Sequence, residues 1–228
     1  QFAGIVLCCL ALLACGQEYI VSEAGYNLDS IDDMTEESWI ALSNTRIYFG
    51  HQSVGFNIME GINNLCNNYK PGLISVVASF DSLLKQEPVF AHSPIGENRD
   101  ASYKISDFAA RIRRIDGKLD IGFFKFCYVD IDNHTDVHSL FNNYRKIMEE
   151  IEIDYPQIKI VHVTVPLTID EKGFKSFLKR IIGRRVRGYK NNIARMRFNE
   201  LLRAEYQGKK PFFDIASIES TTPEGNKI

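Results

Sequence analysis

A serine lies where an apolar run gives way to an amphipathic segment, in the stretch RIYFGHQSVGFN at 46–57. The run 46–49 predicts a strand that Gly50 ends, and the apolar spacing from Val54 onward predicts a helix. A serine on such a turn can be exposed at the sheet edge as a nucleophile, with the helix N-terminus and nearby backbone N–H groups stabilising negative charge. Serine is also a common N-cap residue, so the pattern leaves both roles open for Ser53.

Two glycines and a histidine surround this serine. Gly50 and Gly55 would let the backbone turn sharply and let a substrate approach closely. His51 is expected to contact a ligand, although a side chain two residues from Ser53 is poorly placed to act as an aligned base. His162 has the apolar neighbours of a buried strand residue, whereas the remaining histidines are expected to be exposed: His92, His134 and His138.

Predicted strands and helices alternate along the rest of the chain. Beside the first strand and a helix over 54–68, the patterns predict strands at 73–78, 119–131, 158–165 and 212–216 and helices at 106–115, 137–153 and 191–206. Ser106 is the expected cap of its helix, and 80–102 is expected to be a long loop. The alternation predicts one α/β domain with a mostly parallel sheet, which binds ligands outside the carboxyl ends of its strands.

Composition and charge limit the kinds of partner. The chain has 228 residues, 45% of them hydrophobic, which is enough for one sizeable core. With a net charge of −2, no global field attracts nucleic acid, and no interleaved aromatic residues suggest base stacking. Between 172 and 203 basic residues greatly outnumber the single acid Glu200, which predicts either attraction to anionic lipid or acidic polysaccharide, or a solvated basic face.

The N-terminal residues predict export. Residues 1–15 form an uncharged apolar run like the core and cleavage zone of a secretory signal, and LLACG at 12–16 resembles a bacterial lipobox that would be lipidated at Cys15. We expect a periplasmic or cell-surface lipoprotein, or otherwise a secreted protein, with 16–44 as a polar tether. The alternative is a buried hydrophobic N-terminal helix. The cysteines left after cleavage form no metal-binding or disulfide pattern. We expect neither a metal nor a cofactor.

Four segments resemble a divergent branch of the SGNH/GDSL-type hydrolases: FGHQSVG at 49–55, KFCYVDI at 125–131, HVTVPLT at 162–168 and FDIASIES at 213–220. They occur in the family's order and cover roughly residues 45 to 225. The resemblance implies a flavodoxin-like three-layer α/β/α sandwich over 45–228. It also implies metal-free hydrolysis of acyl esters, often on acylated carbohydrates.

The resemblance also implies roles for individual residues. Ser53 matches the nucleophile, although the usual block reads Gly-Asp-Ser and this chain has GHQS at 50–53. The segment KFCYVDI at 125–131 lacks the asparagine that is usual in the corresponding family block. The candidate replacements are Tyr128, Asp130 and Asn98. The expected contacts to the oxyanion or substrate come from seven residues: Gly50, His51, Gln52, Gly96, Asn98, Tyr128 and Asp130.

The family's Asp-x-x-His motif, which supplies the general base, is missing, since no histidine follows His162. Our interpretation is a C-terminally truncated sequence whose base lies beyond Ile228. Two hypotheses follow: an exported serine esterase acting on carbohydrate or related esters, and a catalytically inactive carbohydrate-binding or scaffold lipoprotein on the same fold.

Overall fold

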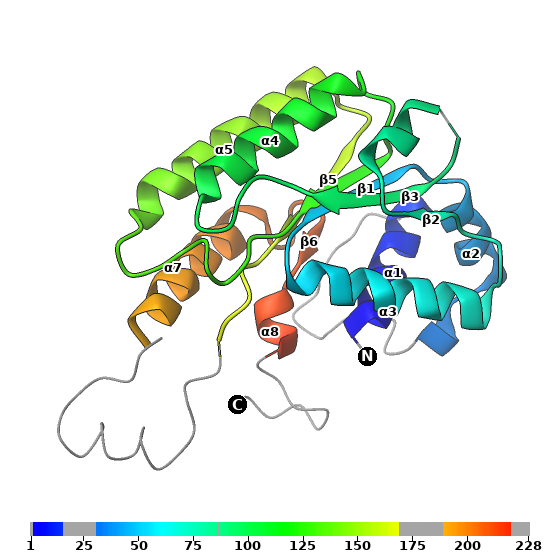
Figure 1. The fold of residues 1–228 in the computed structure, drawn as a ribbon, viewed down its shortest axis with the longest axis horizontal. Coiled ribbons are helices and arrows are strands. Elements are labelled where there is room, and N and C mark those ends of the chain that lie inside the picture. The colour runs from blue at the N-terminus through cyan, green and yellow to red at the C-terminus, as the bar shows by residue number, and fades with distance from the viewer. Residues whose placement is uncertain (1, 16–30, 86, 169–188, 220–228) are drawn as a thin grey trace, which may run out of the picture.

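One parallel sheet organises the chain. The structure, a computed structural model, describes residues 2–15, 31–85, 87–168 and 189–219. Its described strands all pair in parallel, in the order β2-β3-β1-β4-β5-β6 (Figure 1). Their bounds are β1 (Ile47–His51), β2 (Val76–Val77), β3 (Phe90–Pro94), β4 (Ile121–Phe124), β5 (Lys159–Val163) and β6 (Phe212–Phe213). The predicted α/β class is therefore confirmed.

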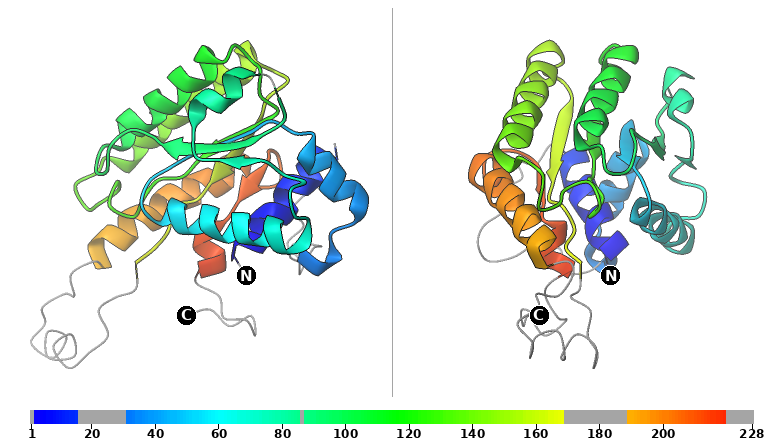
Figure 2. Two further views of the ribbon diagram at one scale, coloured as in Figure 1. Left: turned by 45° about the vertical axis from the view of Figure 1, so that its right-hand side comes forward. Right: turned by 60° about the vertical axis from the view of Figure 1, so that its left-hand side comes forward.

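Helices cover both faces of this sheet (Figures 1 and 2). On one face pack α4 (Ala101–Arg114), α5 (Val137–Asp154) and α7 (Tyr189–Tyr206). On the other face pack α1 (Phe2–Ala14), α2 (Glu36–Ser43), α3 (Val54–Tyr69) and the short α8 (Ile215–Glu219). Short 3₁₀ helices are η1 (Ile31–Asp33) and η2 (Phe80–Lys85). We call the apolar layer between the sheet and α4, α5 and α7 the first core, and the layer on the opposite face the second core. Along β1, Tyr48 points into the first core, whereas Ile47 and Phe49 point into the second, as the alternation of side chains along a strand requires. This is the expected three-layer sandwich.

The chain changes direction across the sheet at β1. It runs from β1 outward to β2 and back to β3 on one side of β1, and then crosses to β4, β5 and β6 on the other side. Apart from the edge strand β2, this succession is that of a flavodoxin-like sheet. Ligand sites of such sheets lie at this reversal point, outside the carboxyl ends of the strands. The loops after β1, β3 and β4 therefore define the edge where a site is expected.

The long helices agree with the periodicity of the sequence. Helices α3, α5 and α7 begin and end within two residues of the ranges predicted for them. In α3 the buried residues Ile58, Ile62 and Cys66 recur every four positions, which places them on one face. The side chain of Asp136 caps α5 by accepting a hydrogen bond from the Ser139 N–H at 3.0 Å.

The predicted loop at 80–102 is wrong. It contains η2, the internal strand β3 and the start of α4. β3 is only five residues long and ends at Pro94, so its own sequence carries little periodic signal, and its pairing with β1 makes it a strand. Helix α4 begins five residues before the predicted Ser106 cap, because the Asp100 carboxylate accepts from the Tyr103 N–H at 2.8 Å and caps it there.

Several predicted strands are shorter in the structure. Of the run 73–78 only two half-buried edge residues pair, and of the run 119–131 only Ile121–Phe124. After Phe124 the chain continues as a loop, in which Phe126, Cys127 and Ile131 are buried while Tyr128 is 40% exposed. The last predicted strand divides into β6 and the helix α8.

The N-terminal segment is a packed helix in this structure. Leu7 and Ala11 of α1 are fully buried in the second core, and Lys159 Nζ donates to the Leu13 carbonyl. Part of the predicted tether also forms a helix, α2, which buries Trp39 and Leu42. The buried N-terminal helix was the alternative to a signal, while cleavage, export and lipidation of Cys15 stay predictions. No helix among the described residues combines the length and apolar character needed to cross a bilayer.

We expect Leu7→Ala to lower the free energy of unfolding by about 2 to 5 kcal/mol, because it leaves a cavity in the second core. The control is Ile153→Ala, at a side chain that is 78% exposed, for which a change within about 0.5 kcal/mol is expected. Both are measured by urea unfolding of the chain 1–228. A Leu7 variant as stable as the parent chain would show that α1 does not belong to the folded core.

Candidate functional site

Ser53 sits on a tight and strained turn. Only two residues separate the last residue of β1 from the first of α3, and Ser53 has φ 50° and ψ −115°. A non-glycine residue in such a conformation costs on the order of 1 to 3 kcal/mol. Ser53 is exposed, and although it occupies the N-cap position its side chain makes no capping hydrogen bond. Of the two roles left open by the sequence, the structure therefore gives no support to side-chain capping.

Two glycines allow this turn to be so tight. A Cβ on Gly55 would lie 2.3 Å from the Cβ of His51, so α3 can start directly over the end of β1 only with glycine there. A Cβ on Gly50 would lie 2.9 Å from two side-chain carbons of Ile95. Both glycines thus serve the close approach of protein segments to each other.

Gln52 connects the serine turn to its neighbours. Its side-chain Nε2 donates to the carbonyls of Gly96 at 2.9 Å and Ile95 at 3.2 Å, in the loop after β3. Its own carbonyl accepts from Cys127 Sγ at 3.5 Å, in the loop after β4. The loops that follow β1, β3 and β4 are therefore joined around Ser53.

A buried ion pair joins the first turn of α4 to the loop after β4. Lys104 Nζ lies 2.6 Å from Asp130 Oδ2, and both side chains are 0% exposed. The Asp130 carboxylate also accepts from the backbone N–H groups of Cys127 at 2.6 Å and Arg99 at 2.8 Å. A carboxylate only accepts hydrogen bonds, so Asp130 cannot donate to an oxyanion. Its role is to position the loops after β3 and β4, which corrects its place among the expected donors.

The same lysine orients Asn98. Its Nζ donates to Asn98 Oδ1 at 3.1 Å, and because an ammonium group has no acceptor, the amide oxygen must be the atom that faces it. The Asn98 Nδ2 donors consequently point away from Lys104, and the residue is exposed. The nearby Gly96 N–H donates to Asp107 Oδ2 at 2.8 Å and is already engaged. Of Gly96 and Asn98, the two expected oxyanion contacts in this loop, only Asn98 therefore has N–H donors that remain available to a ligand.

Tyr128 also lies at this edge of the sheet. It is 40% exposed, and the Arg195 guanidinium stands 5.6 Å from the centre of its ring. Arg195 itself is fixed by donating to the Ile131 carbonyl at 3.1 Å and to Asn192 Oδ1 at 2.6 Å. The phenol of Tyr128 is therefore held at the loop after β4, with part of its surface open to a ligand.

His51 lies behind the turn rather than on its surface. It is fully buried, and its Nε2 is 2.9 Å from His92 Nδ1, while its Nδ1 has no partner among the described residues. Burial, followed by the positive charges of His92 and Lys125, lowers the pKa of His51 to about 3. The expected ligand contact of His51 does not fit this burial. His92 is buried too, contrary to the prediction, and burial lowers its pKa.

The other histidines are where the sequence placed them. His134 and His138 are exposed. His162 is buried, with its ring stacked on that of Tyr206 at 3.5 Å between centroids and its Nδ1 2.9 Å from the Tyr144 hydroxyl. No hydrogen bond joins Ser53 to a histidine within the described part of the chain, nor do three His, Cys, Asp or Glu side chains gather there as for a metal ion.

The third and fourth family-like segments meet at the ends of β5 and β6. Asp214 accepts from both Nε and Nη2 of Arg203, at 2.7 and 2.9 Å, and from the Thr164 hydroxyl at 3.0 Å. Its Oδ1 also accepts from the Ser217 N–H at 3.0 Å, which caps α8. These contacts give Asp214 a structural role. The basic residues at 172–188 and the serine at 220 lie outside the described residues.

Sequence reasoning missed the two buried lysines of this edge. Lys125 is 1% exposed, and burial is the main reason why its pKa is lowered. Its Nζ lies 3.7 Å from Cys127 Sγ. A lysine that interrupts an apolar run, as in GFFKFCY at 122–128, is the signal that marks Lys125. For Lys104 the surrounding sequence offers no comparable mark.

Asp130→Asn is expected to lower the free energy of unfolding by about 3 to 5 kcal/mol, because it leaves the buried Lys104 charge without its partner. Glu150→Gln, which breaks the exposed pair with Arg113, should cost less than about 1 kcal/mol. Urea unfolding measures both. The double variant Lys104→Met, Asp130→Asn should be more stable than Asp130→Asn, and a reversed order would refute the uncompensated charge as the cause.

The buried histidine predicts how stability changes with pH. Since folding lowers the pKa of His51 from 6.5 to about 3, the unfolded chain binds more protons within this window, and the free energy of unfolding falls as pH drops through it. His51→Gln should reduce that slope by up to about 1.4 kcal/mol per pH unit. Urea unfolding between about pH 4 and 7 measures it, with exposed His138→Gln as control. An unchanged slope in the His51 variant would contradict this assignment.

Comparisons with known proteins add only distant structural likeness. No family model matches the sequence, and no curated protein matches it. Among solved structures, the chain is similar to a protein from Streptococcus pneumonia named as a candidate platelet activating factor, at 15% identity and a TM-score of 0.39, over 82% of this chain and 74% of that one. A likeness this low assigns neither a family nor an activity, and the architecture rests on the described strands and helices.

Proposed function

We propose that the chain is a serine hydrolase of acyl esters, with Ser53 as the nucleophile. The observation that carries this proposal is the conformation of Ser53: an exposed, strained, non-capping serine on a two-residue strand-to-helix turn. An N-cap serine ordinarily adopts an unstrained extended backbone and bonds to the helix through its hydroxyl. Strained strand-to-helix turns that present a serine are typical of hydrolase nucleophiles.

We assign stabilisation of the oxyanion to two donors. The first is the Val54 N–H at the start of α3, which has no hydrogen-bond partner within the described residues. The second is the outward-directed Nδ2 of Asn98, which takes the place of the asparagine missing from the family-like segment at 125–131. Because the Gln52 side chain binds the Gly96 carbonyl, the Asn98 loop is tied to the serine turn. Fixed donors of this kind act where charge develops in the transition state.

The reaction follows from these groups. Ser53 Oγ attacks the ester carbonyl, the oxyanion is held by Val54 N–H and Asn98 Nδ2, and the alcohol leaves as the acyl group stays on the serine. Water then releases the acid and restores the serine. The proton of Ser53 passes to a general base. His51 and His92 are not available for that role, because they are buried and bonded to each other.

The proposed setting and substrate come from the sequence. We propose an exported protein, anchored in a membrane through lipid on Cys15, that removes acyl groups from a carbohydrate or a related ester. The exposed Tyr128 is a suitable surface for a sugar ring, since aromatic side chains combine an apolar face with a polar edge. Neither nucleic acid nor a metal has a part in this proposal.

A second candidate is a carbohydrate-binding or scaffold lipoprotein that has lost catalysis. The observation in its favour is that no histidine among the described residues is bonded to Ser53. An Asp-x-x-His motif in the gene beyond codon 228 favours the esterase, whereas a stop codon without that motif favours the binding protein.

Ser53→Ala in the chain expressed to its natural stop codon is expected to abolish hydrolysis of a small acyl ester such as p-nitrophenyl acetate, by at least about 10³-fold in kcat/KM. The fold should remain intact, because Ser53 is exposed and makes no side-chain capping bond. Release of p-nitrophenol and far-UV circular dichroism measure the two properties. Full activity in the folded variant would end the esterase proposal.

Asn98→Leu should reduce kcat by about 10²-fold while changing KM little, because it removes a donor to the transition state. Asn98→Asp is the more stringent variant, since it keeps the acceptor for Lys104 and replaces the amide donor with a negative charge. Steady-state kinetics on the same ester give the result. Unchanged kcat in both variants would exclude Asn98 as an oxyanion donor.

A further inference from the structure

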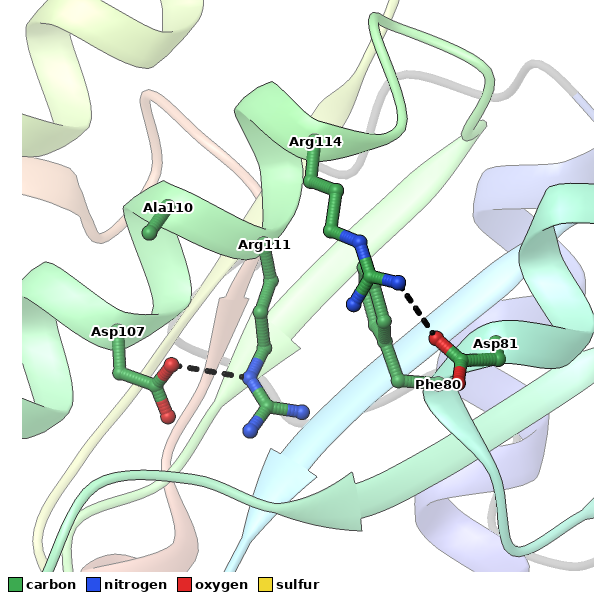
Figure 3. Close-up of a pocket in the computed structure, with 6 residues that line it drawn as sticks. All are labelled: Phe80, Asp81, Asp107, Ala110, Arg111 and Arg114. Atoms are coloured by element: carbon green, nitrogen blue, oxygen red, sulfur yellow. Dashed lines mark hydrogen bonds and ion pairs between the residues drawn. The ribbon is translucent and has the colours of Figure 1, made fainter.

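A pocket of about 370 Å³ lies between η2 and α4 (Figure 3). Its lining combines an aromatic ring, two guanidinium groups and two carboxylates: Phe80, Asp81, Asp107, Ala110, Arg111 and Arg114. We propose that this pocket binds a small ligand through an oxyanion head group, either a carboxylate or a phosphate. The proposal is independent of the esterase activity assigned to Ser53.

Arg111 forms the fixed part of this site. Its Nε donates to Asp107 Oδ1 at 3.1 Å, and its Nη1 donates to the hydroxyls of Ser93 at 2.8 Å and Tyr48 at 3.2 Å. The side chain is 25% exposed, and its Nη2 has no partner within the described residues. The guanidinium is therefore held in place before any ligand arrives, with donors still available in the pocket.

Arg114 forms the adjustable part. It is 58% exposed, and its one carboxylate contact, with Asp81 at 3.1 Å, joins two well-solvated groups. Exposed pairs of this kind are weak. A ligand oxyanion can therefore replace the Asp81 carboxylate at little cost, and Asp81, 67% exposed, can turn into solvent.

Phe80 brings the two arginines together. Its ring is buried, and the guanidinium carbons of Arg111 and Arg114 both lie 5.4 Å from its centre. Figure 3 shows both side chains extending from α4 toward this ring. Two planar guanidinium groups at one ring offer several N–H donors to the same small volume, an arrangement suited to carboxylate and phosphate.

The carboxylates of the pocket do not cancel this preference. Asp107 is occupied on both oxygens, by Arg111 Nε and by the Gly96 N–H at 2.8 Å, so its charge is already partly compensated. Asp81 is the one acidic group of the lining that an anion must displace.

The volume indicates the size of the ligand. A pocket of about 370 Å³ exceeds what an inorganic ion needs and lies at the lower end of small-molecule sites. The head group therefore belongs to a molecule of about monosaccharide size. Arg111 is ten residues beyond the first residue of α4, or about 15 Å along the helix from the Ser53 edge, so the two sites are separate.

The test is isothermal titration calorimetry of the folded chain at low ionic strength. The ligands are inorganic phosphate, glucose 6-phosphate and glucuronate, each titrated separately. We expect saturable binding of at least one sugar-sized anion, tighter than that of inorganic phosphate. Arg114→Gln should weaken this binding about tenfold, and Arg111→Gln should weaken it further. The preferred sugar-sized anion identifies the head group as phosphate or carboxylate.

The matched control is Arg113→Gln, on the same helix but paired with Glu150 and not part of the pocket lining. Its affinity should stay that of the parent chain. Arg111→Gln removes contacts to two buried hydroxyls and can unfold the chain. If it does, the affinity of Arg114→Gln compared with that of Arg113→Gln tests the proposal. Absence of saturable binding for all three anions, or equal weakening by Arg113→Gln and Arg114→Gln, would overturn the proposal and leave these arginines as groups that hold η2 on α4.

Discussion

The ion pair between Lys104 and Asp130 is the interaction on which the carboxyl edge of this sheet depends. Two charges withdrawn completely from water are tolerated only if each has partners of good geometry. Here the Asp130 carboxylate is surrounded by the ammonium group and two backbone N–H groups, and the ammonium group also holds Asn98. Because these partners come from α4, the loop after β3 and the loop after β4, satisfying the charges fixes the three segments relative to one another.

The serine turn is built against this fixed edge. Its strained backbone at Ser53 persists because the surroundings leave it no alternative: Gly55 lets α3 start on top of His51, and Gln52 ties the turn to the neighbouring loops. A further connection runs through Asp107, which joins the Gly96 N–H to Arg111 in the pocket beside α4. The edge with Ser53 and the arginine pocket are thus separate sites linked by one carboxylate.

Much of the fold could be predicted from the sequence, because helix-forming information is local. Helices α3, α5 and α7 are set by apolar residues three and four positions apart, and the alternation of strands with helices implies a parallel sheet. Strand β3 was not predicted, because the information that makes it a strand is not local. Five residues that end in proline carry little periodicity, and they become a central strand only by hydrogen bonding to β1, some forty residues away in the chain.

By itself, the sequence determined that Ser53 lies between a strand and a helix, at the carboxyl edge of a parallel sheet. Only the tertiary structure decided that the serine is strained and exposed, that His51 and His92 are buried against each other, and that Asn98 presents its amide donors outward. The reason is physical: a buried charge or polar group is placed by partners from distant segments, and no local pattern records which partners those are.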